Sequence, residues 1–139
     1  MTDTTVTTDP KIAAVQRLYA AYATKDIDAV LAELDDDVDW AAEASGTLAP
    51  WWGKYSGKAA VPNFFMAIGE TLDVHVFELV SFCSSETDVV STVHWSYTVR
   101  ATGKSAEMYM QHWWRFEGGK IVFFRGSEDT EQSARALTP

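Results

Sequence analysis

Two histidines in the last third of the chain have the side chains best suited to chemistry. His94 and His112 lie in neighbouring stretches with strand-like alternation, and the turn signal Thr102-Gly103 separates them. A histidine titrates near neutral pH, so in a pocket it can transfer a proton to or from a carbonyl or enol. Either histidine could instead satisfy hydrogen bonds in a polar cavity without taking part in a reaction.

The strand pairing decides whether the two histidines meet. If the connection 100–106 is an odd-length loop centred on Gly103, His94 lies opposite His112 and the two share one face. A two-residue turn would shift the pairing by one residue and place the histidines on opposite faces. We expect the odd-length loop, so this face should also carry Ser96, Thr98, Met108, Met110 and Trp114.

The opposite face of the same strand pair is also rich in aromatic side chains. In the expected register it carries Trp95, Tyr97, Val99, Glu107, Tyr109, Gln111 and Trp113. A sheet with one face in water should alternate apolar and polar residues. We therefore expect one face to meet helices and a cavity, and the outer face to meet a second copy of the chain in a homodimer.

Two carboxylates at the end of the last predicted strand, Glu128 and Asp129, are further candidates for proton transfer. The turn before that strand decides which of its residues face the pocket. A three-residue bulged loop over 117–119 would direct Phe124 inward. A two-residue turn at the two glycines would direct Arg125 inward instead. We expect the bulged loop.

The spacing of apolar residues and the positions of capping and turn residues predict the elements that position these side chains. A helix should begin at Pro10 with Asp9 as its N-cap, and Asp35 to Asp37 should form a solvated turn that ends a second helix. Residues 1–9 are expected to form a disordered tail. The pattern predicts helices over 10–24, 25–34 and 58–72 and strands over 38–43 and about 73–83, 87–100, 105–117 and 120–128. This order predicts one α+β domain over 10–139, with three N-terminal helices packed on a curved, mostly antiparallel sheet.

Aromatic residues make up 13% of the chain and include six tryptophans. This richness fits either a heavily aromatic core or an apolar ligand cavity. A loop predicted over 44–57 contains Trp51, Trp52 and Tyr55, and exposed tryptophans are unfavourable, so this loop should fold over something apolar. We expect the side chains that hold an apolar ligand to be Tyr22, Trp40, Trp52, Tyr55, Met108, Met110, Trp114 and Phe124, with Ser96 and Thr98 beside them.

The charge of the chain excludes several classes of partner. A net charge of −9 and a pI near 4.6 argue against nucleic acid and against anionic membranes. No apolar run is long enough to span a bilayer, and the N-terminus lacks the features of a secretory signal. With Cys83 as its single cysteine, the chain has no internal disulfide and is expected to be cytoplasmic. Because no nucleotide, nucleophile-elbow or zinc motif is present, we expect no cofactor and no metal.

Three segments in order resemble the NTF2-like superfamily, in its SnoaL-like (polyketide cyclase) and ketosteroid isomerase-like branch. They are VQRLYAAYATKDIDAVLAELDDDVDW at 15–40, WGKYSGKAAVPNFF at 52–65 and HWWRFEGGKIVFFRGSED at 112–129. The resemblance implies a cone-shaped α+β barrel with a deep apolar pocket, usually dimeric. The superfamily includes isomerases, cyclases, dehydratases, epoxide hydrolases and plain binding modules, so the fold does not determine the activity.

The resemblance also assigns catalytic positions. The place of the base carboxylate of ketosteroid isomerases falls on Ala42. Polyketide cyclases use a histidine on the third long strand, which His112 matches, and an aspartate on the last strand. That aspartate falls on Gly126 or, in another register, on Asp129.

Three functions remain compatible with these residues. The first is a cofactor-free isomerase, cyclase or hydro-lyase that acts on an apolar carbonyl compound, with His112 transferring the proton and His94, Glu128 or Asp129 assisting. The second is a binding module that keeps the cavity and has lost the base. The third is a dimerising interaction domain with a filled core.

Overall fold

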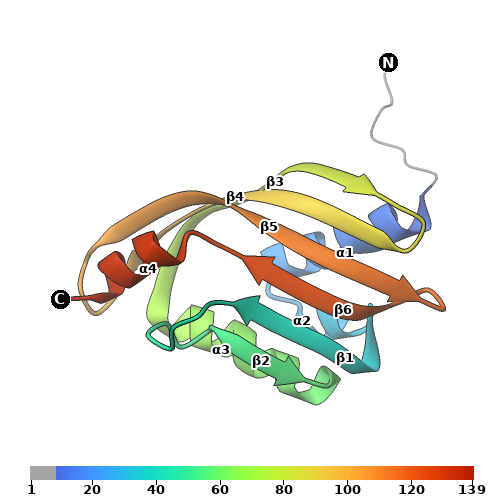
Figure 1. The fold of residues 1–139 in the computed structure, drawn as a ribbon, viewed down its shortest axis with the longest axis horizontal. Helices are drawn as coiled ribbons and strands as arrows, with labels where there is room; N and C mark the ends of the chain where they lie inside the picture. The colour runs from blue at the N-terminus through green and yellow to red at the C-terminus, as the bar shows by residue number, and fades with distance from the viewer. Residues whose placement is uncertain (1–8) are drawn as a thin grey trace.

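A strongly curved sheet organises the computed structural model, which describes residues 9–139. Within these residues six strands pair in the order β2-β1-β6-β5-β4-β3 (Figure 1). Neighbouring strands are antiparallel except β1 and β6, which are parallel. The strands are β1 (Leu34–Glu43), β2 (Gly53–Ser56), β3 (Leu72–Ser84), β4 (Asp88–Val99), β5 (Ser105–Glu117) and β6 (Lys120–Ser127). The α+β class and the curved, mostly antiparallel sheet are therefore confirmed.

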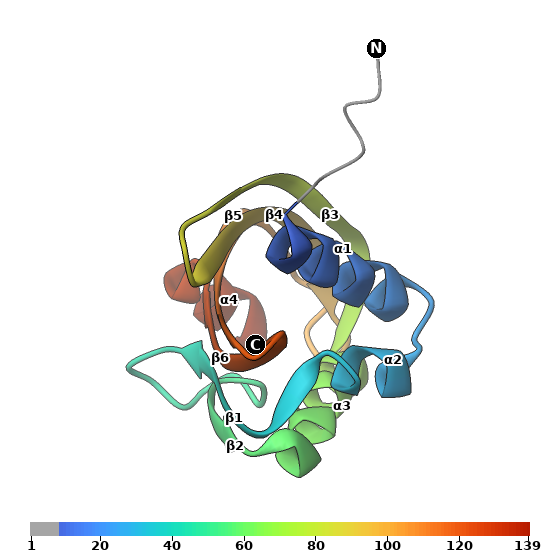
Figure 2. The same ribbon diagram turned by 90° about the vertical axis from the view of Figure 1, so that its right-hand side faces the viewer.

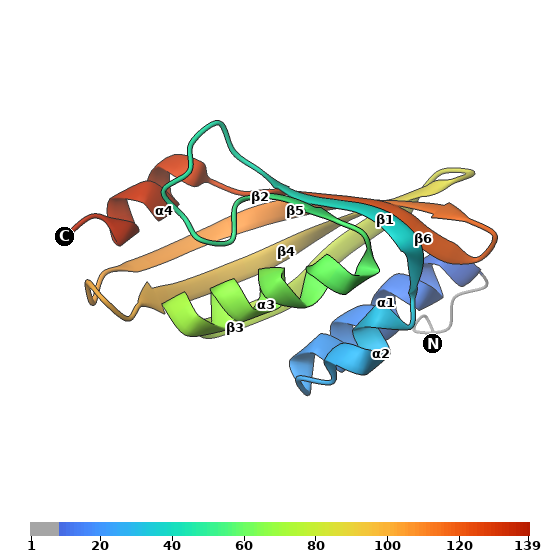
Figure 3. The ribbon, with the colours of Figure 1, turned by 90° about the horizontal axis from the view of Figure 1, so that it is seen from below.

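Three helices lie on one side of the sheet, and the sheet curls around them (Figures 2 and 3). They are α1 (Pro10–Ala23), α2 (Ile27–Leu31) and α3 (Val61–Thr71), the last preceded by a 3-10 turn at Lys58–Ala60. Asp9 caps α1 as predicted, because its carboxylate accepts a hydrogen bond from the Lys11 backbone N–H at 2.9 Å. The rest of the predicted disordered tail, residues 1–8, lies outside the described residues.

The segment after α1 differs from the prediction of a helix over 25–34. Lys25 has a φ of 63° and closes the end of α1, so it cannot begin the next helix. Asp26 caps a five-residue helix instead, and β1 already begins at Leu34. The predicted solvated turn at Asp35 to Asp37 is wrong, since these residues lie in β1, next to the pairing of Leu34 with Ile121.

The register of β4 and β5 corrects the central prediction about the histidines. His94 pairs with Tyr109 and His112 pairs with Ser91. The connection is not an odd-length loop. The Val99 N–H donates a hydrogen bond to the carbonyl of Lys104, and this bond encloses the four residues 100–103. An even-length connection gives the opposite side-chain parity, so His94, Ser96 and Thr98 lie on the face away from His112.

The turn between β5 and β6 gives the predicted orientation by a different route. Glu117 pairs with Lys120, so the loop has only the two residues Gly118 and Gly119, and the three-residue loop is wrong. A bulge between Arg115 and Phe116 then inserts one extra residue into β6 and restores the parity. As a result Phe124 pairs with Trp114 and faces inward, as predicted, and Arg125 does not.

Two elements were not predicted, the short edge strand β2 and a C-terminal helix α4 (Thr130–Leu137). Asp129 begins α4 by accepting a hydrogen bond from the backbone N–H of Gln132. The helix packs against β4 and β5, with Ser133 and Ala136 buried. It thereby brings polar groups to one end of the inner face of the sheet. No helix within residues 9–139 is long and apolar enough to cross a membrane.

Candidate functional site

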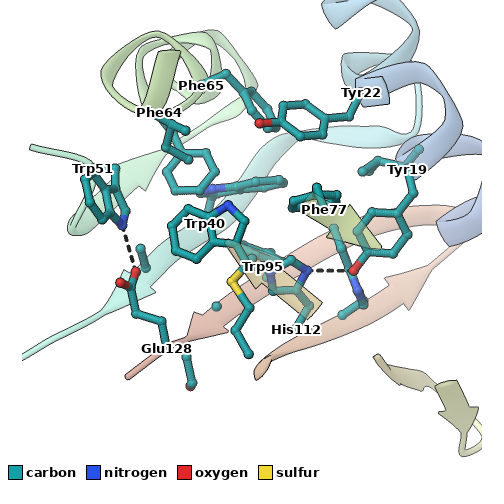
Figure 4. A pocket seen from close by; sticks show the side chains of 18 residues that line it. Tyr19, Tyr22, Trp40, Trp51, Phe64, Phe65, Phe77, Trp95, His112 and Glu128 are labelled. Atoms are coloured by element: carbon teal, nitrogen blue, oxygen red, sulfur yellow. Dashed lines mark hydrogen bonds between the residues drawn. The ribbon is translucent and has the colours of Figure 1, made fainter. Parts of the chain in front are cut away.

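An apolar cavity lies between the concave face of the sheet and the helices (Figure 4). The space left between the lining atoms, including the mouth, amounts to about 620 Å³, and about 50 Å³ of it is open to the centre of a water molecule. That is room for a few waters, so a larger ligand must displace some of the aromatic rings. The lining side chains are Leu18, Tyr19, Tyr22, Trp40, Ala42, Trp51, Phe64, Phe65, Ile68, Phe77, Trp95, Met110, His112, Trp114, Phe124, Gly126, Ser127 and Glu128.

His112 enters the cavity from β5, where strict alternation directs every second side chain inward. Its ring nitrogen Nδ1 is 2.6 Å from the hydroxyl of Tyr19 on α1. The Tyr19 hydroxyl is also 2.7 Å from Ser91 Oγ, which accepts a hydrogen bond from the indole N–H of Trp114 at 3.2 Å. All four residues are buried, so helix α1 and strands β4 and β5 hold the imidazole in one orientation.

The hydrogen-bond network favours one tautomer of His112. If Ser91 donates to Tyr19 and Tyr19 donates to Nδ1, every hydroxyl hydrogen in the network has an acceptor. In the reverse direction the Ser91 hydrogen would have none among the described residues. Nδ1 is therefore the acceptor and the proton is on Nε2, which has no hydrogen bond to a described residue. Burial lowers the pKa of His112 to about 3, so the ring is neutral at neutral pH.

Glu128 provides the second titratable group of the cavity. Its Oε1 accepts a hydrogen bond from the indole N–H of Trp51 at 2.7 Å, and its Oε2 accepts one from Ser133 on α4. Ser133 in turn bonds the hydroxyl of Tyr97 at 2.6 Å. Burial raises the pKa of the Glu128 carboxyl, while the bonds from Ser133 and Trp51 oppose that rise. In Figure 4 Glu128 lies beside Trp51, apart from His112, which points toward Tyr19.

The cavity brings together half of the residues predicted for the site. Asp129 is outside it and serves as the cap of α4, where the bond from the Gln132 backbone N–H lowers its pKa. His94, Ser96 and Thr98 are outside it because of the register. Predicted residues that line the cavity are His112, Glu128, Tyr22, Trp40, Met110, Trp114 and Phe124; the others that do not are Trp52, Tyr55 and Met108.

On the outer face, His94 has a local environment of its own. Its Nε2 is 2.7 Å from the carboxylate of Glu107, and its ring stacks on Tyr109 with centroids 5.0 Å apart. Thr98 bonds His75 at 2.8 Å on the same face. These contacts separate His94 from the cavity chemistry.

Sequence reasoning missed several lining residues. Trp95 was placed on the outer face by the wrong register, and Trp51 was assigned to the loop without a role in the site. Tyr19 has a detectable signal, because it lies on the apolar face of the first predicted helix, yet its bond to His112 spans 93 residues of sequence. Among the described residues, no group of three or more His, Cys, Asp or Glu side chains could hold a metal ion.

Comparisons with known proteins agree with this architecture. The family model of the SnoaL-like domain matches residues 15–124. An NTF2-like protein from Burkholderia thailandensis E264 is 33% identical with a TM-score of 0.83, over 91% of this chain and 96% of that one. An NTF2-like protein of unknown function from Burkholderia pseudomallei K96243 is 26% identical with a TM-score of 0.86, over 94% and 99%. TerC, whose crystals contain polyporic acid, is 22% identical with a TM-score of 0.83, over 93% and 98%. No curated protein matches significantly.

Proposed function

The chain belongs to the SnoaL-like family of NTF2-like proteins, and from that premise we propose that it binds an apolar carbonyl compound in its cavity and acts on it as an isomerase, cyclase or hydro-lyase. The reaction is acid–base chemistry at the carbonyl group and needs no cofactor or metal. A small organic ligand is supported by the co-crystallisation of polyporic acid with TerC, which has the same fold.

The observation that carries this proposal is the buried, oriented and neutral His112. Its Nδ1 is occupied by Tyr19, and its Nε2 is left for a ligand. In this tautomer Nε2–H donates a hydrogen bond to the carbonyl oxygen of the substrate. That bond strengthens as negative charge develops on the oxygen in an enolate-like transition state, which lowers the barrier.

Glu128 is the partner that takes up the proton from carbon. A carboxyl whose pKa is raised by burial is a stronger base when ionised than an ordinary glutamate, and its pKa is closer to neutral. The neutral His112 therefore acts as the electrophile that binds the carbonyl oxygen, and Glu128, with its raised pKa, acts as the base. His94 and Asp129 take no part in this scheme, because neither side chain lines the cavity.

Two steps test the proposal. Native mass spectrometry of the purified protein, followed by denaturation, should release a bound apolar carbonyl compound. With that compound as substrate, His112→Ala should lower kcat by about 10²–10⁴-fold with a nearly unchanged KM. His112→Asn is the matched control for folding, since its side-chain oxygen can still accept the bond from Tyr19 while nothing replaces Nε2. Wild-type turnover by His112→Ala would refute catalysis by this residue.

A non-catalytic binding module is the alternative, and a specific observation favours it. Ala42 and Gly126 both line the cavity and carry no acid. The resemblance to ketosteroid isomerases and polyketide cyclases implies a carboxylate at these two positions. Both oxygens of Glu128 are also already bonded within the protein. Under this alternative the bound compound is recovered unchanged after prolonged incubation with the protein.

The assembly and location follow the same proposal. We propose a homodimer that forms through the outer face of the sheet, where Val90, Tyr109 and Trp113 are exposed. Val90 and Trp113 are direct cross-strand partners, so they form one continuous apolar area. The chain is proposed to act in the cytoplasm, with neither nucleic acid nor membrane as a partner.

A further inference from the structure

We propose that the indole Nε1–H of Trp40 is the hydrogen-bond anchor for an acceptor oxygen of the cavity ligand. The sequence and the family suggest only an apolar wall at this position. The inference rests on the proposed function and narrows its ligand class to neutral, flat compounds with a ketone or similar acceptor oxygen. It also makes Trp40 a residue that determines specificity.

The evidence begins with an unpaired buried donor. Trp40 lies on β1, is 1% exposed and lines the cavity. Its Nε1 is buried and has no hydrogen-bond partner among residues 9–139. More than about 90% of buried polar groups in proteins are paired, so such an exception needs an explanation. A ligand that supplies the missing acceptor is one.

Two of the other three cavity indoles are already paired; the third, Trp95, has no hydrogen bond to a described residue, but its nitrogen is less completely buried than that of Trp40. The N–H of Trp51 donates to Glu128, and the N–H of Trp114 donates to Ser91. The indole nitrogen of Trp52 also has no hydrogen-bond partner within residues 9–139. It is nevertheless close enough to Glu128 to lower the pKa of that carboxyl. Trp52 does not line the cavity, so its nitrogen is not available to a ligand there.

The neighbours of Trp40 keep its donor in place. Its ring packs on Phe124 with centroids 4.1 Å apart and makes edge contacts with Phe64, Phe65 and Trp114 at 5.5 to 5.9 Å. Rotating the indole toward another acceptor would break this packing. The donor therefore keeps one orientation, and an acceptor oxygen reaches its almost fully covered nitrogen when the ligand displaces a neighbouring ring.

The chemistry of an indole restricts what can bind. An indole nitrogen donates and cannot accept, so it matches a carbonyl or ether oxygen and does not match an ammonium group. His112 Nε2 is a second donor in the tautomer that its network favours. The walls around both are aromatic or aliphatic, which favours a neutral, flat ligand body.

A matched pair of small probes tests the anchor without any activity assay. 1-Indanone and indane have the same bicyclic body, and only the former has a carbonyl oxygen. Titrations of ¹⁵N-labelled wild-type protein followed by NMR give both affinities. A neutral hydrogen bond should make the ketone bind about threefold to tenfold more tightly. The ketone should also move the Trp40 indole proton downfield, whereas indane should not.

Two variants separate the donor from the ring. Trp40→Phe keeps an aromatic ring and removes the N–H, so the preference for the ketone should disappear. Trp51→Phe makes the same change at a cavity indole that already donates to Glu128, so it should retain the preference. The wild-type spectrum alone decides the matter if Trp40→Phe does not fold.

The outcomes are distinguishable. Equal affinity of wild-type protein for both probes, or a downfield shift confined to the indole of Trp95, would overturn the anchor and leave the proposed function intact. If neither probe binds, the apolar-carbonyl cavity itself is refuted together with the anchor. A preference that persists in Trp40→Phe would also refute the role of the indole N–H.

Discussion

At the scale of single residues, the cavity shifts the pKa values of its two titratable groups in opposite directions. Burial lowers the pKa of His112 to about 3, so the folded protein binds fewer protons there than the unfolded chain does. Burial raises the pKa of Glu128, so the folded protein retains a proton that the unfolded chain loses. The first effect weakens the fold as the pH falls below about 6.5, and the second weakens it as the pH rises above about 4.5.

The Glu128 effect gives a prediction with a definite sign. The stability it contributes is full below the unfolded pKa, near 4.5, and is lost as the pH rises through the raised folded value. In Glu128→Gln the difference in unfolding free energy from the wild type should therefore change in favour of the variant between pH 4.5 and 8. Urea denaturation at half-unit steps of pH measures this difference. A flat curve for Glu128→Gln would show that its carboxyl titrates as in the unfolded chain.

At the scale of elements, local sequence signals predicted what depends on local chemistry. Helix α1, its cap at Asp9 and the four long strands follow from apolar spacing and turn residues, and the structure has them within one or two residues. The register of β4 and β5 does not, because it depends on the number of residues that the connection encloses. An error of one residue there exchanged Trp95 for His94 at the cavity. A bulge compensated for the second turn error, which no local signal revealed.

The glycine turn between β5 and β6 gives a prediction at this scale. Gly118 and Gly119 have φ of 55° and 81°, and a side chain at either would meet nothing within 4 Å. Backbone strain alone therefore decides the effect of a substitution. Gly119→Val should cost about 1–2 kcal/mol of unfolding free energy, whereas Gly118→Asn should be nearly neutral, because asparagine adopts this conformation readily. Urea denaturation measures both; a neutral Gly119→Val would mean that the turn relaxes to another loop type.

At the scale of the whole molecule, the sheet has to serve two apolar environments. Its concave face carries the cavity, and burial alternates along β4 and β5 with a period of two. The outer face is not uniformly polar, since Tyr109 is 62% and Trp113 40% exposed. Large exposed aromatic side chains that cluster on one face indicate an interaction surface. A face that evolved only to meet water would not need them.

The oligomeric state of variants tests whether the outer face is a dimer interface. The wild-type protein should sediment as a dimer at micromolar concentration, and Tyr109→Lys combined with Trp113→Lys should shift it to the monomer, because the two changes remove exposed aromatic rings and place charged groups in an apolar interface. Leu48→Lys, which changes an exposed apolar residue in the loop between β1 and β2, should leave the dimer intact.

Salt distinguishes an apolar interface from a charged one. Each chain carries a formal net charge of −9, so two copies repel one another, and added salt screens that repulsion. An apolar interface should therefore tighten as sodium chloride is raised from 0.05 to 0.5 M, and sedimentation velocity would show a lower dissociation constant. A dimer that loosens with salt would instead depend on ion pairs across the interface, and the aromatic side chains of the outer face would need another partner.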